Sequence, residues 1–207
     1  MKLLVATRSA HKMSEIRQIL GSVPNLTVLD LTDAGIAPDP VEDDLEVYET
    51  FEENALAKAE YFFRLSGMPT VADDSGLEVD ALGGAPGVRS KRFAPDTGLD
   101  GQARDDANNR YLVEKLEGVE PVDRTARYVC VAALLEAGNE PFYARGEAPG
   151  LVLDAPQGKG GFGYDPYIYD PKFGGTFAEM SPAEKNERSH RGAAFGALAS
   201  SLAKRAM

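Results

Sequence analysis

The N-terminal residues alternate between apolar and polar stretches in an order typical of a strand, a turn and a helix. An apolar run over 2–6 predicts a buried strand, and a polar stretch follows over 7–12. Apolar side chains then recur at helical spacing until Gly21, and they are Met13, Ile16, Ile19 and Leu20. This order places backbone N–H groups at a helix N-terminus just past a strand end, where phosphate groups commonly bind.

The rest of the chain alternates between further strands and helices. Strand patterns cover 26–31, 70–72, 77–82, 125–136 and 141–147. Helical patterns follow the capping sequences Thr50–Glu53 and Ser181–Glu184 and also cover 100–117 and 191–205. This mixed order predicts an α/β fold in which helices flank a mixed β-sheet. We see no internal repeat and no linker, so we expect a single domain over 1–207.

Composition narrows the class of protein. Hydrophobic residues make up 43% of the chain, which is enough for a core, and no apolar run approaches the roughly 18 residues of a membrane helix. The net charge of −11 argues against a nucleic-acid surface, because such a surface needs a basic face. The single cysteine, Cys130, lies in an apolar run, so we expect an inert buried thiol and no disulfide within the chain. We therefore expect a cytoplasmic protein that binds neither membrane nor nucleic acid.

Two adjacent carboxylates, Asp73 and Asp74, follow the strand predicted over 70–72. At a strand end such a pair can hold Mg²⁺, which prefers oxygen ligands, and can orient a water molecule. The alternative is an ordinary acidic turn over 73–76. More carboxylates lie in the loop predicted over 38–49, where most of them are simply solvated. An acidic chain that binds an anionic small molecule would need such a metal, a local cationic pocket, or both.

Lys12 offers a cation at the start of the first predicted helix. A lysine there can meet a phosphate as a point charge, and the alternative is a solvated surface lysine. The turn over 7–12 is not a P-loop, because it lacks the required glycine spacing. His11, in the same turn, could touch a phosphate but is expected to be merely exposed.

A glycine-rich stretch over 160–165 and the basic segment after it have the composition of a base-binding site. Phe162 could stack on a base, with a carboxylate nearby to accept hydrogen bonds, since glycine lets a backbone approach a ligand closely. The alternative is a tight turn with buried aromatic side chains. His190 has polar neighbours, and the cationic Lys185 and Arg191 lie close to it in sequence.

Taken together, these segments resemble the inosine triphosphate pyrophosphatase family. The matching segments are Ala6-Thr7-x-Ser9-x-x-Lys12, Phe51-x-Glu53-Asn54-Ala55, Ala72-Asp-Asp-Ser-Gly76, Gly83-Gly-Ala-Pro-Gly-Val88, Gly160-Gly-Phe-Gly-Tyr-Asp-Pro166 and Glu184-Lys-Asn-x-x-Ser-His-Arg191. Each segment alone is a weak signal. All of them occur in the family's order and span nearly the whole chain, which makes the resemblance specific.

The resemblance implies an activity, a cofactor and an architecture. Members of the family remove non-canonical purine nucleotides by hydrolysing dITP, ITP and XTP to the monophosphate and pyrophosphate with Mg²⁺. The implied fold is an elongated α/β structure with two lobes around a central active-site cleft, usually in a homodimer. The resemblance also implies that Asp74 is the catalytic base and a metal ligand, and that Glu46 is the second metal carboxylate. The residues matched to substrate contacts are Thr7, Arg8, Ser9, Ala10, His11 and Lys12 in the phosphate-binding turn, Ser75, Phe162, Gly163, Tyr164 and Asp165 in the base and sugar pocket, and Lys185, His190 and Arg191 at the purine-recognition end.

Two departures from the family pattern affect these assignments. The family usually has asparagine where this chain has Ser9, so one phosphate contact is expected to be lost or bridged by water. The chain has Tyr48 where the family often has glycine, which requires a different local backbone and leaves Glu49 as an alternative to Glu46.

The residues also leave some alternatives open. The sequence does not decide whether Asp73 or Asp74 is the base, because adjacent carboxylates titrate together. Two other functions also fit: a pyrophosphatase for other modified nucleotides, and a nucleotide sensor without catalysis. The Ser-His-Arg segment ending at Arg191 favours purine, and the intact Lys12 argues against a sensor.

Overall fold

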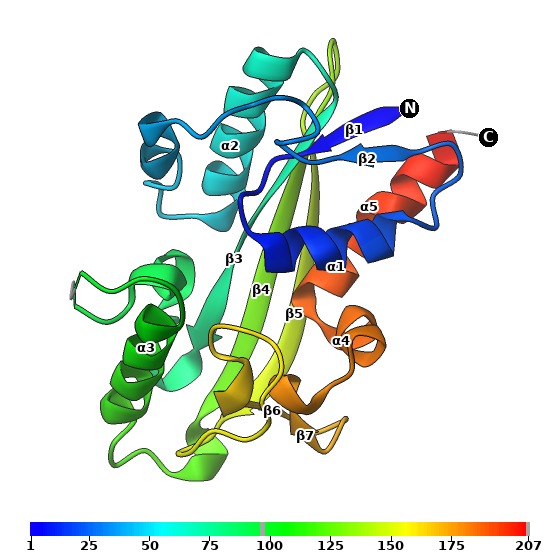
Figure 1. The fold of residues 1–207 in the computed structure, drawn as a ribbon. Coiled ribbons are helices and arrows are strands. Elements are labelled where there is room, and N and C mark those ends of the chain that lie inside the picture. The colour runs from blue at the N-terminus through cyan, green and yellow to red at the C-terminus, as the bar shows by residue number, and fades with distance from the viewer. Residues whose placement is uncertain (96–97, 206–207) are drawn as a thin grey trace. The chain divides into compact units, whose positions relative to one another are not determined.

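The computed structural model describes residues 1–95 and 98–205, whose arrangement is shown in Figure 1. Within these residues the strands are β1 (Lys2–Val5), β2 (Thr27–Leu29), β3 (Thr70–Val79), β4 (Thr125–Leu135), β5 (Phe142–Val152), β6 (Ile168–Asp170) and β7 (Gly175–Thr176). The helices are α1 (Ala10–Leu20), α2 (Phe51–Ser66), α3 (Gly101–Lys115), α4 (Pro182–Arg188) and α5 (His190–Arg205). This mixture of strands and helices confirms the predicted α/β fold.

The strands of the described residues form one open, mixed sheet in the order β2-β1-β3-β4-β5-β6-β7. β1 is parallel to both β2 and β3, whereas β6 is antiparallel to both β5 and β7. The predicted mixed sheet is therefore confirmed. Val5 pairs with Val71 across β1 and β3, so the turn that follows β1 begins beside the strand segment that carries Asp73.

The chain divides into two compact units, each built from segments that are distant in sequence. Unit 1 comprises Met1–Asp74, Cys130–Gly146 and His190–Met207, and unit 2 comprises Ser75–Val129 and Glu147–Ser189. Each unit is described by itself below. A single domain over 1–207 whose two lobes surround a cleft stays a prediction.

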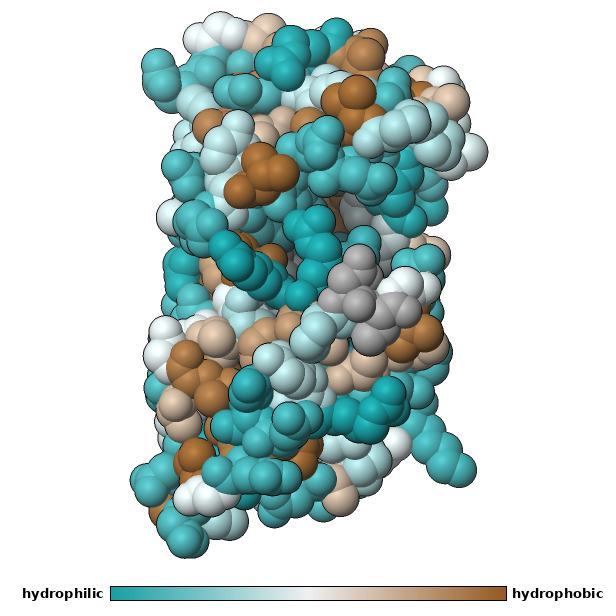
Figure 2. Space-filling model, turned by 90° about the vertical axis from the view of Figure 1, so that its left-hand side faces the viewer, coloured by the Kyte–Doolittle hydropathy of each residue, from teal (hydrophilic) through white to brown (hydrophobic). Residues whose placement is uncertain are grey.

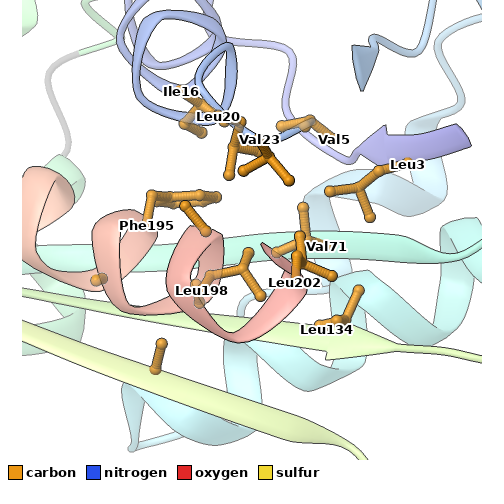
Figure 3. Close-up of a cluster of buried hydrophobic side chains, with 14 of the residues drawn as sticks. Leu3, Val5, Ile16, Leu20, Val23, Val71, Leu134, Phe195, Leu198 and Leu202 are labelled. Atoms are coloured by element: carbon orange, nitrogen blue, oxygen red, sulfur yellow. The ribbon is translucent and has the colours of Figure 1, made fainter. Parts of the chain in front are cut away.

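The core of unit 1 fixes the position of α1 on the sheet. α1 packs against α5, and Figure 3 shows Ile16 and Leu20 of α1 directed toward Phe195 of α5. Other buried side chains of this core are Leu3, Val5, Val71, Leu134, Leu198 and Leu202. Full burial of one such side chain stabilises a fold by roughly 1.5–3 kcal/mol. The start of α1 is therefore held firmly at the end of β1.

The core of unit 2 is formed by β3, β4, β5, β6 and the later turns of α3. Leu112 and Leu116, at the end of α3, are fully buried. Tyr128 packs edge-on against Phe177 with 5.3 Å between the ring centroids. Other buried members are Leu77, Val79, Ala126, Ala148, Val152, Tyr164, Ile168 and Met180. The earlier turns of α3 bury polar side chains instead, and the sequence pattern did not predict this.

The strand predicted to end at residue 72 continues to Val79, so the expectation of a strand end or acidic turn at 73–76 is wrong. Both Asp73 and Asp74 are buried within this continuous strand. Cations of the same unit surround the two carboxylates, and this compensation allows a buried strand to carry them. The second predicted strand, over 77–82, is the end of β3 followed by a short 3₁₀ helix over Asp80–Leu82.

The strand predicted over 141–147 is also longer, because β5 continues to Val152. Glycines inside β5 are explained by close packing. A Cβ atom at Gly146 would lie 2.2 Å from the backbone oxygen of His190, and one at Gly150 would lie 2.7 Å from Cγ2 of Ile168. Only glycine therefore fits at these two positions.

The molecular face drawn in Figure 2 is mainly hydrophilic, and apolar residues occupy small, separate groups on it. The large hydrophobic side chains exposed on the described residues are Met1, Val41, Val47, Tyr48, Leu65, Val122 and Tyr143. No helix in the described part of the chain is long and apolar enough to cross a membrane.

Candidate active site

The polar turn over 7–12 forms the N-terminal cap of α1. The Oγ atom of Ser9 accepts a hydrogen bond from the backbone N–H of Lys12 at 3.3 Å, which makes Ser9 the N-cap residue. Thr7 supports the same turn, because its Oγ1 accepts from the N–H of Ser9 at 3.2 Å. His11 is exposed, as expected. The turn is therefore an N-capped helix start, a position where anions commonly bind.

Arg8, in the same turn, points to a neighbouring loop. Its guanidinium group donates to the carboxylate of Glu42 at 2.7 and 2.9 Å and to the backbone oxygens of Ile36 and Ala37 at 3.0 Å each. A cavity of about 490 Å³ opens beside the turn. Its lining residues are Thr7, Arg8, Ser9, Ala10, Met13, Ser14, Arg17, Gln18, Asp30, Leu31 and Thr32.

Beside the turn, unit 1 gathers a set of ionised side chains that we call the charged cluster: Lys12, Glu46, Lys58, Asp73, Asp74 and Arg191. The Nζ atom of Lys12 lies 2.9 Å from Oδ2 of Asp73, and a guanidinium nitrogen of Arg191 lies 3.6 Å from the same oxygen. Lys58 contacts the carboxylate of Glu46 and donates to the backbone oxygen of Asp73 at 2.5 Å. Three cations thus neutralise most of the charge of three carboxylates.

The two adjacent carboxylates have opposite pKa shifts. Burial raises the pKa of Asp73, but the charges of Lys12 and Arg191 outweigh burial and hold that pKa well below its ordinary value. For Asp74, burial outweighs the attraction of the Lys58 ammonium group, so the pKa is raised. The two neighbouring carboxyl groups therefore differ in proton affinity, and that of Asp74 is the higher.

Asn54, on α2, links Asp74 to the loop that carries Glu46. The Nδ2 atom of Asn54 donates to Oδ2 of Asp74 at 2.9 Å and to the backbone oxygen of Tyr48 at 3.2 Å. Its Oδ1 accepts from the N–H of Tyr48 at 2.9 Å. Tyr48 is thus accommodated in place of glycine through its backbone, while its side chain is exposed. In the same loop, Glu46 contacts Lys58.

Glu46 and Asp74 have the chemistry expected of Mg²⁺ ligands. Lys58 contacts the Glu46 carboxylate and the backbone oxygen of Asp73, the residue that precedes Asp74. Burial raises the pKa of Glu46, but the charge of Lys58 outweighs burial and lowers this pKa, so Glu46 is ionised. Across residues 1–95 and 98–205, no group of three or more His, Cys, Asp or Glu side chains forms a complete set of metal ligands. Two carboxylates still fit Mg²⁺, which takes one or two of them beside substrate phosphates.

Arg191 and His190 lie at the start of α5 in unit 1, and both are buried. The guanidinium group of Arg191 donates to Oε2 of Glu15 at 2.6 Å in addition to facing Asp73. Cys130 lies behind the same carboxylate, with its Sγ atom 3.8 Å from Oδ2 of Asp73. The predicted buried cysteine is confirmed, and burial raises the pKa of its thiol.

In unit 2, the glycine-rich stretch over 160–165, which we call the aromatic loop, closes around Asp165. The carboxylate of Asp165 accepts hydrogen bonds from the N–H of Phe162 at 2.9 Å, the hydroxyl of Tyr128 at 3.1 Å and the Nζ of Lys185 at 2.6 Å. The Lys185 ammonium group also lies 4.5 Å from the centre of the Phe162 ring. A Cβ atom at Gly161 would lie 2.1 Å from Oδ2 of Asp165, so this turn requires glycine.

The structure brings most of the predicted residues into these two groups. In unit 1 it gathers the turn, Glu46, Asp74 and Arg191, and in unit 2 it gathers the aromatic loop and Lys185. Ser75 follows Asp74 on β3 and is partly exposed. Sequence reasoning missed Glu15, Asn54, Lys58 and Tyr128. The motif Phe51-x-Glu53-Asn54-Ala55 was a signal for Asn54 alone.

Comparisons with known proteins point to one family. The sequence model of the Ham1 family matches residues 3–201. The chain is 44% identical over 197 residues to the dITP/XTP pyrophosphatase of Geobacter sulfurreducens, which covers 95% of this chain and 94% of the relative. It is 42% identical to the dITP/XTP pyrophosphatase of Clostridium perfringens over 207 residues, with 97% of each chain covered. A solved structure of a HAM1 protein from Coxiella burnetii is 34% identical, has a TM-score of 0.84 and covers 99% of both chains.

Proposed function

Since the chain belongs to the Ham1 family, we propose that it is a nucleoside triphosphate pyrophosphatase that cleanses the nucleotide pool of dITP, ITP and XTP. The products would be the nucleoside monophosphate and pyrophosphate. The observation that carries the proposal is the charged cluster, in which a proton acceptor, Asp74, adjoins cations suited to phosphate and a pair of carboxylates suited to a metal. The names of the similar proteins support the same choice of substrate.

The phosphate end of the substrate is assigned to unit 1. Backbone N–H groups at the start of α1 and the ammonium group of Lys12 bind the phosphates. Lys58 lies among the carboxylates of the cluster and supplies a second cation. Catalysis then depends mainly on positioning and on charges placed in advance, because phosphoryl transfer needs little covalent chemistry from the protein.

Glu46 and Asp74 would hold Mg²⁺, which neutralises phosphate charge when it is bound. Asp74 takes a proton from a water molecule, and the water oxygen attacks the α-phosphorus. The bond from the α-phosphorus to the bridging oxygen breaks, and pyrophosphate leaves. Asn54 holds one oxygen of Asp74, which fixes the orientation of the base.

The nucleobase is assigned to residues that can stack and donate. In unit 2, Phe162 supplies a ring for stacking, and Lys185 supplies a donor for the 6-oxo group of hypoxanthine or xanthine. Adenine presents an amino donor at that position, and a buried donor left unpaired costs roughly 1–3 kcal/mol. For Arg191, the ion pairs with Asp73 and Glu15 favour a role in ordering the cluster.

The test is pyrophosphate release from ITP, XTP, dGTP and ATP, with and without Mg²⁺, for the wild type and Asp74→Asn. We expect Mg²⁺-dependent turnover of ITP and XTP that is lost in the variant. Turnover of modified pyrimidine or methylated nucleotides alone would favour the related pyrophosphatase. Binding of ITP in calorimetry without any turnover would support a sensor and refute the enzyme.

A homodimer and a cytoplasmic location complete the proposal. Both come from the family resemblance, and the acidic net charge of −11 is consistent with a protein that avoids nucleic acid. Light scattering coupled to size-exclusion chromatography measures the mass in solution. A mass near twice 22.2 kDa is expected, and a mass near 22.2 kDa would contradict the dimer.

A further inference from the structure

Two side chains of α3 form hydrogen bonds with both backbone polar groups of one residue of the aromatic loop, Gly163. The N–H of Gly163 donates to Oδ2 of Asp105 at 3.0 Å, and Nδ2 of Asn109 donates to the backbone oxygen of Gly163 at 2.9 Å. Asp105 and Asn109 are four residues apart, so they lie on the same face of α3. Gly163 has a φ of +62°, a conformation in which a residue with a side chain is strained.

Burying the polar amide of Asn109 costs free energy unless its hydrogen bonds compensate for the lost water. Asn109 is only 4% exposed, and its Oδ1 accepts no hydrogen bond from the described residues. A leucine would fill a buried helical position without that desolvation cost, as Leu112 does one turn later. The amide at 109 is therefore better explained by its bond to Gly163 than by packing.

The next residue of the loop is anchored to the same framework. The hydroxyl of Tyr164 donates to the backbone oxygen of Ser90 at 2.7 Å, and Nδ2 of Asn108 donates to that same oxygen at 3.3 Å. Oδ1 of Asn108 accepts from the N–H of Ala94 at 2.9 Å. Asn109 thus contacts Gly163 directly, whereas Asn108 and Tyr164 share one backbone acceptor, and every contact lies inside unit 2.

We propose that Asp105 and Asn109 are positioning residues that set the orientation of Phe162 and Asp165 and thereby determine nucleobase selectivity. Both groups flank Gly163 in the chain, so a rotation at this glycine moves the ring away from the carboxylate. A misplacement of about 1 Å can cost roughly 100-fold in an enzyme's efficiency. This inference rests on the proposed function, because it takes the loop to be the base-binding element.

The test compares steady-state kinetics of Asn109→Leu and Asp105→Leu with two controls. Asp105→Asn keeps an oxygen that can accept from Gly163, and Arg110→Leu alters an exposed position of the same helix. We expect Asn109→Leu and Asp105→Leu to raise the KM for ITP by ~10-fold or more and to lower the ITP-to-ATP ratio of kcat/KM, with kcat nearly unchanged. Both controls should behave like the wild type.

Hydrogen exchange of the Gly163 amide, measured by NMR, reports the hydrogen bond to Asp105 independently of nucleotide selectivity. Faster exchange in Asp105→Leu with an unchanged KM and ITP-to-ATP ratio would overturn the inference, because the contacts would then be structural only. If Asn109→Leu does not fold, Asn109→Ser removes the same donor with a smaller side chain. If the wild type turns over no nucleotide, the proposed function fails. The ITP affinity of the same variants, measured by calorimetry, then decides whether Asp105 and Asn109 position a binding loop.

Discussion

The charged cluster of unit 1 and the aromatic loop of unit 2 each contain a buried carboxylate, Asp73 and Asp165, but these two have different kinds of donor. Asp73 faces the ammonium group of Lys12 and the guanidinium group of Arg191. Asp165 has one cationic partner, Lys185, and takes its other hydrogen bonds from a backbone N–H and a phenol. Charge dominates the first region, and hydrogen-bond geometry dominates the second.

The difference extends to what each carboxylate supports. In unit 1 the fixed charge of Asp73 lies next to Asp74, whose raised pKa suits proton transfer. In unit 2 the second set of polar contacts goes to the backbone of Gly163, from Asp105 and Asn109. Under the proposed function, the first region serves chemistry and the second serves recognition, so variants in the two should change different kinetic constants.

The largest effect is expected for Asp74→Asn. Loss of the proton acceptor should lower kcat by about 10²–10⁴-fold and leave the KM for ITP nearly unchanged. The variant should remain folded, because the asparagine oxygen can still accept the hydrogen bond from Asn54. Steady-state pyrophosphate release and thermal unfolding measure the two effects. A kcat within threefold of the wild type would remove Asp74 from its assigned role.

Asp73→Asn should affect stability instead. It leaves the charges of Lys12 and Arg191 without their shared counter-ion, which costs about 3–5 kcal/mol for a buried pair. Urea unfolding at pH 7 measures the change. The matched control is Arg145→Ala, which breaks an exposed pair with Glu52 and should cost less than ~1 kcal/mol. Equal losses of unfolding free energy in the two variants would contradict the expected difference between the buried and the exposed ion pairs.

Phe162→Leu tests the recognition side. Base stacking on an aromatic side chain is worth roughly 1–3 kcal/mol, so we expect the KM for ITP to rise by ~10-fold while kcat is retained. Tyr143→Leu, at an exposed aromatic residue of β5, is the control and should change neither constant. A loss confined to kcat would show that the ring acts in chemistry rather than in binding.

The smallest effect concerns a carboxylate of unit 2 outside both regions. Burial raises the pKa of Asp170, but hydrogen bonds from Arg188 and from the N–H groups of Lys172 and Phe173 outweigh it, so this pKa is lowered. Since the folded pKa is depressed, the stabilisation is present above pH ~4 and is lost as pH falls through the folded value. Asp170→Asn should therefore cost ~1 kcal/mol at pH 6, and progressively less below pH 4, in urea unfolding. A cost that does not vary with pH would refute the ionic contribution.

Local patterns in the sequence were enough to predict most elements of the fold. The helix after the turn over 7–12, the cap at Thr50 and the helix that begins after Ser181 all follow local signals, and the structure confirms them. β3 was predicted too short because its carboxylates are compensated by partners such as Lys12, which is distant in sequence. β5 was predicted to end before Pro149, but it continues because its alternating burial extends to Val152.

The candidate site was predictable where a motif carried it and not where tertiary contacts built it. Lys58 lies on the apolar stripe of a helix and has no local signal for a partner such as Glu46. Asn109 lies in a segment whose composition predicts a solvated helix, yet it is buried against a loop 54 residues away. Such pairings depend on the register of packed elements, and a short sequence window does not contain that information.

The chain's only cysteine makes the native protein a reporter of its own local opening. Cys130 is completely buried on β4 behind the oxygen of Asp73, and a thiol reagent can attack it only after that strand opens. The labelling rate of the unmodified chain thus measures how often the structure opens locally beside Asp73. A ligand or ion that stabilises the charged cluster would lower the labelling rate of Cys130, so no engineered probe is needed.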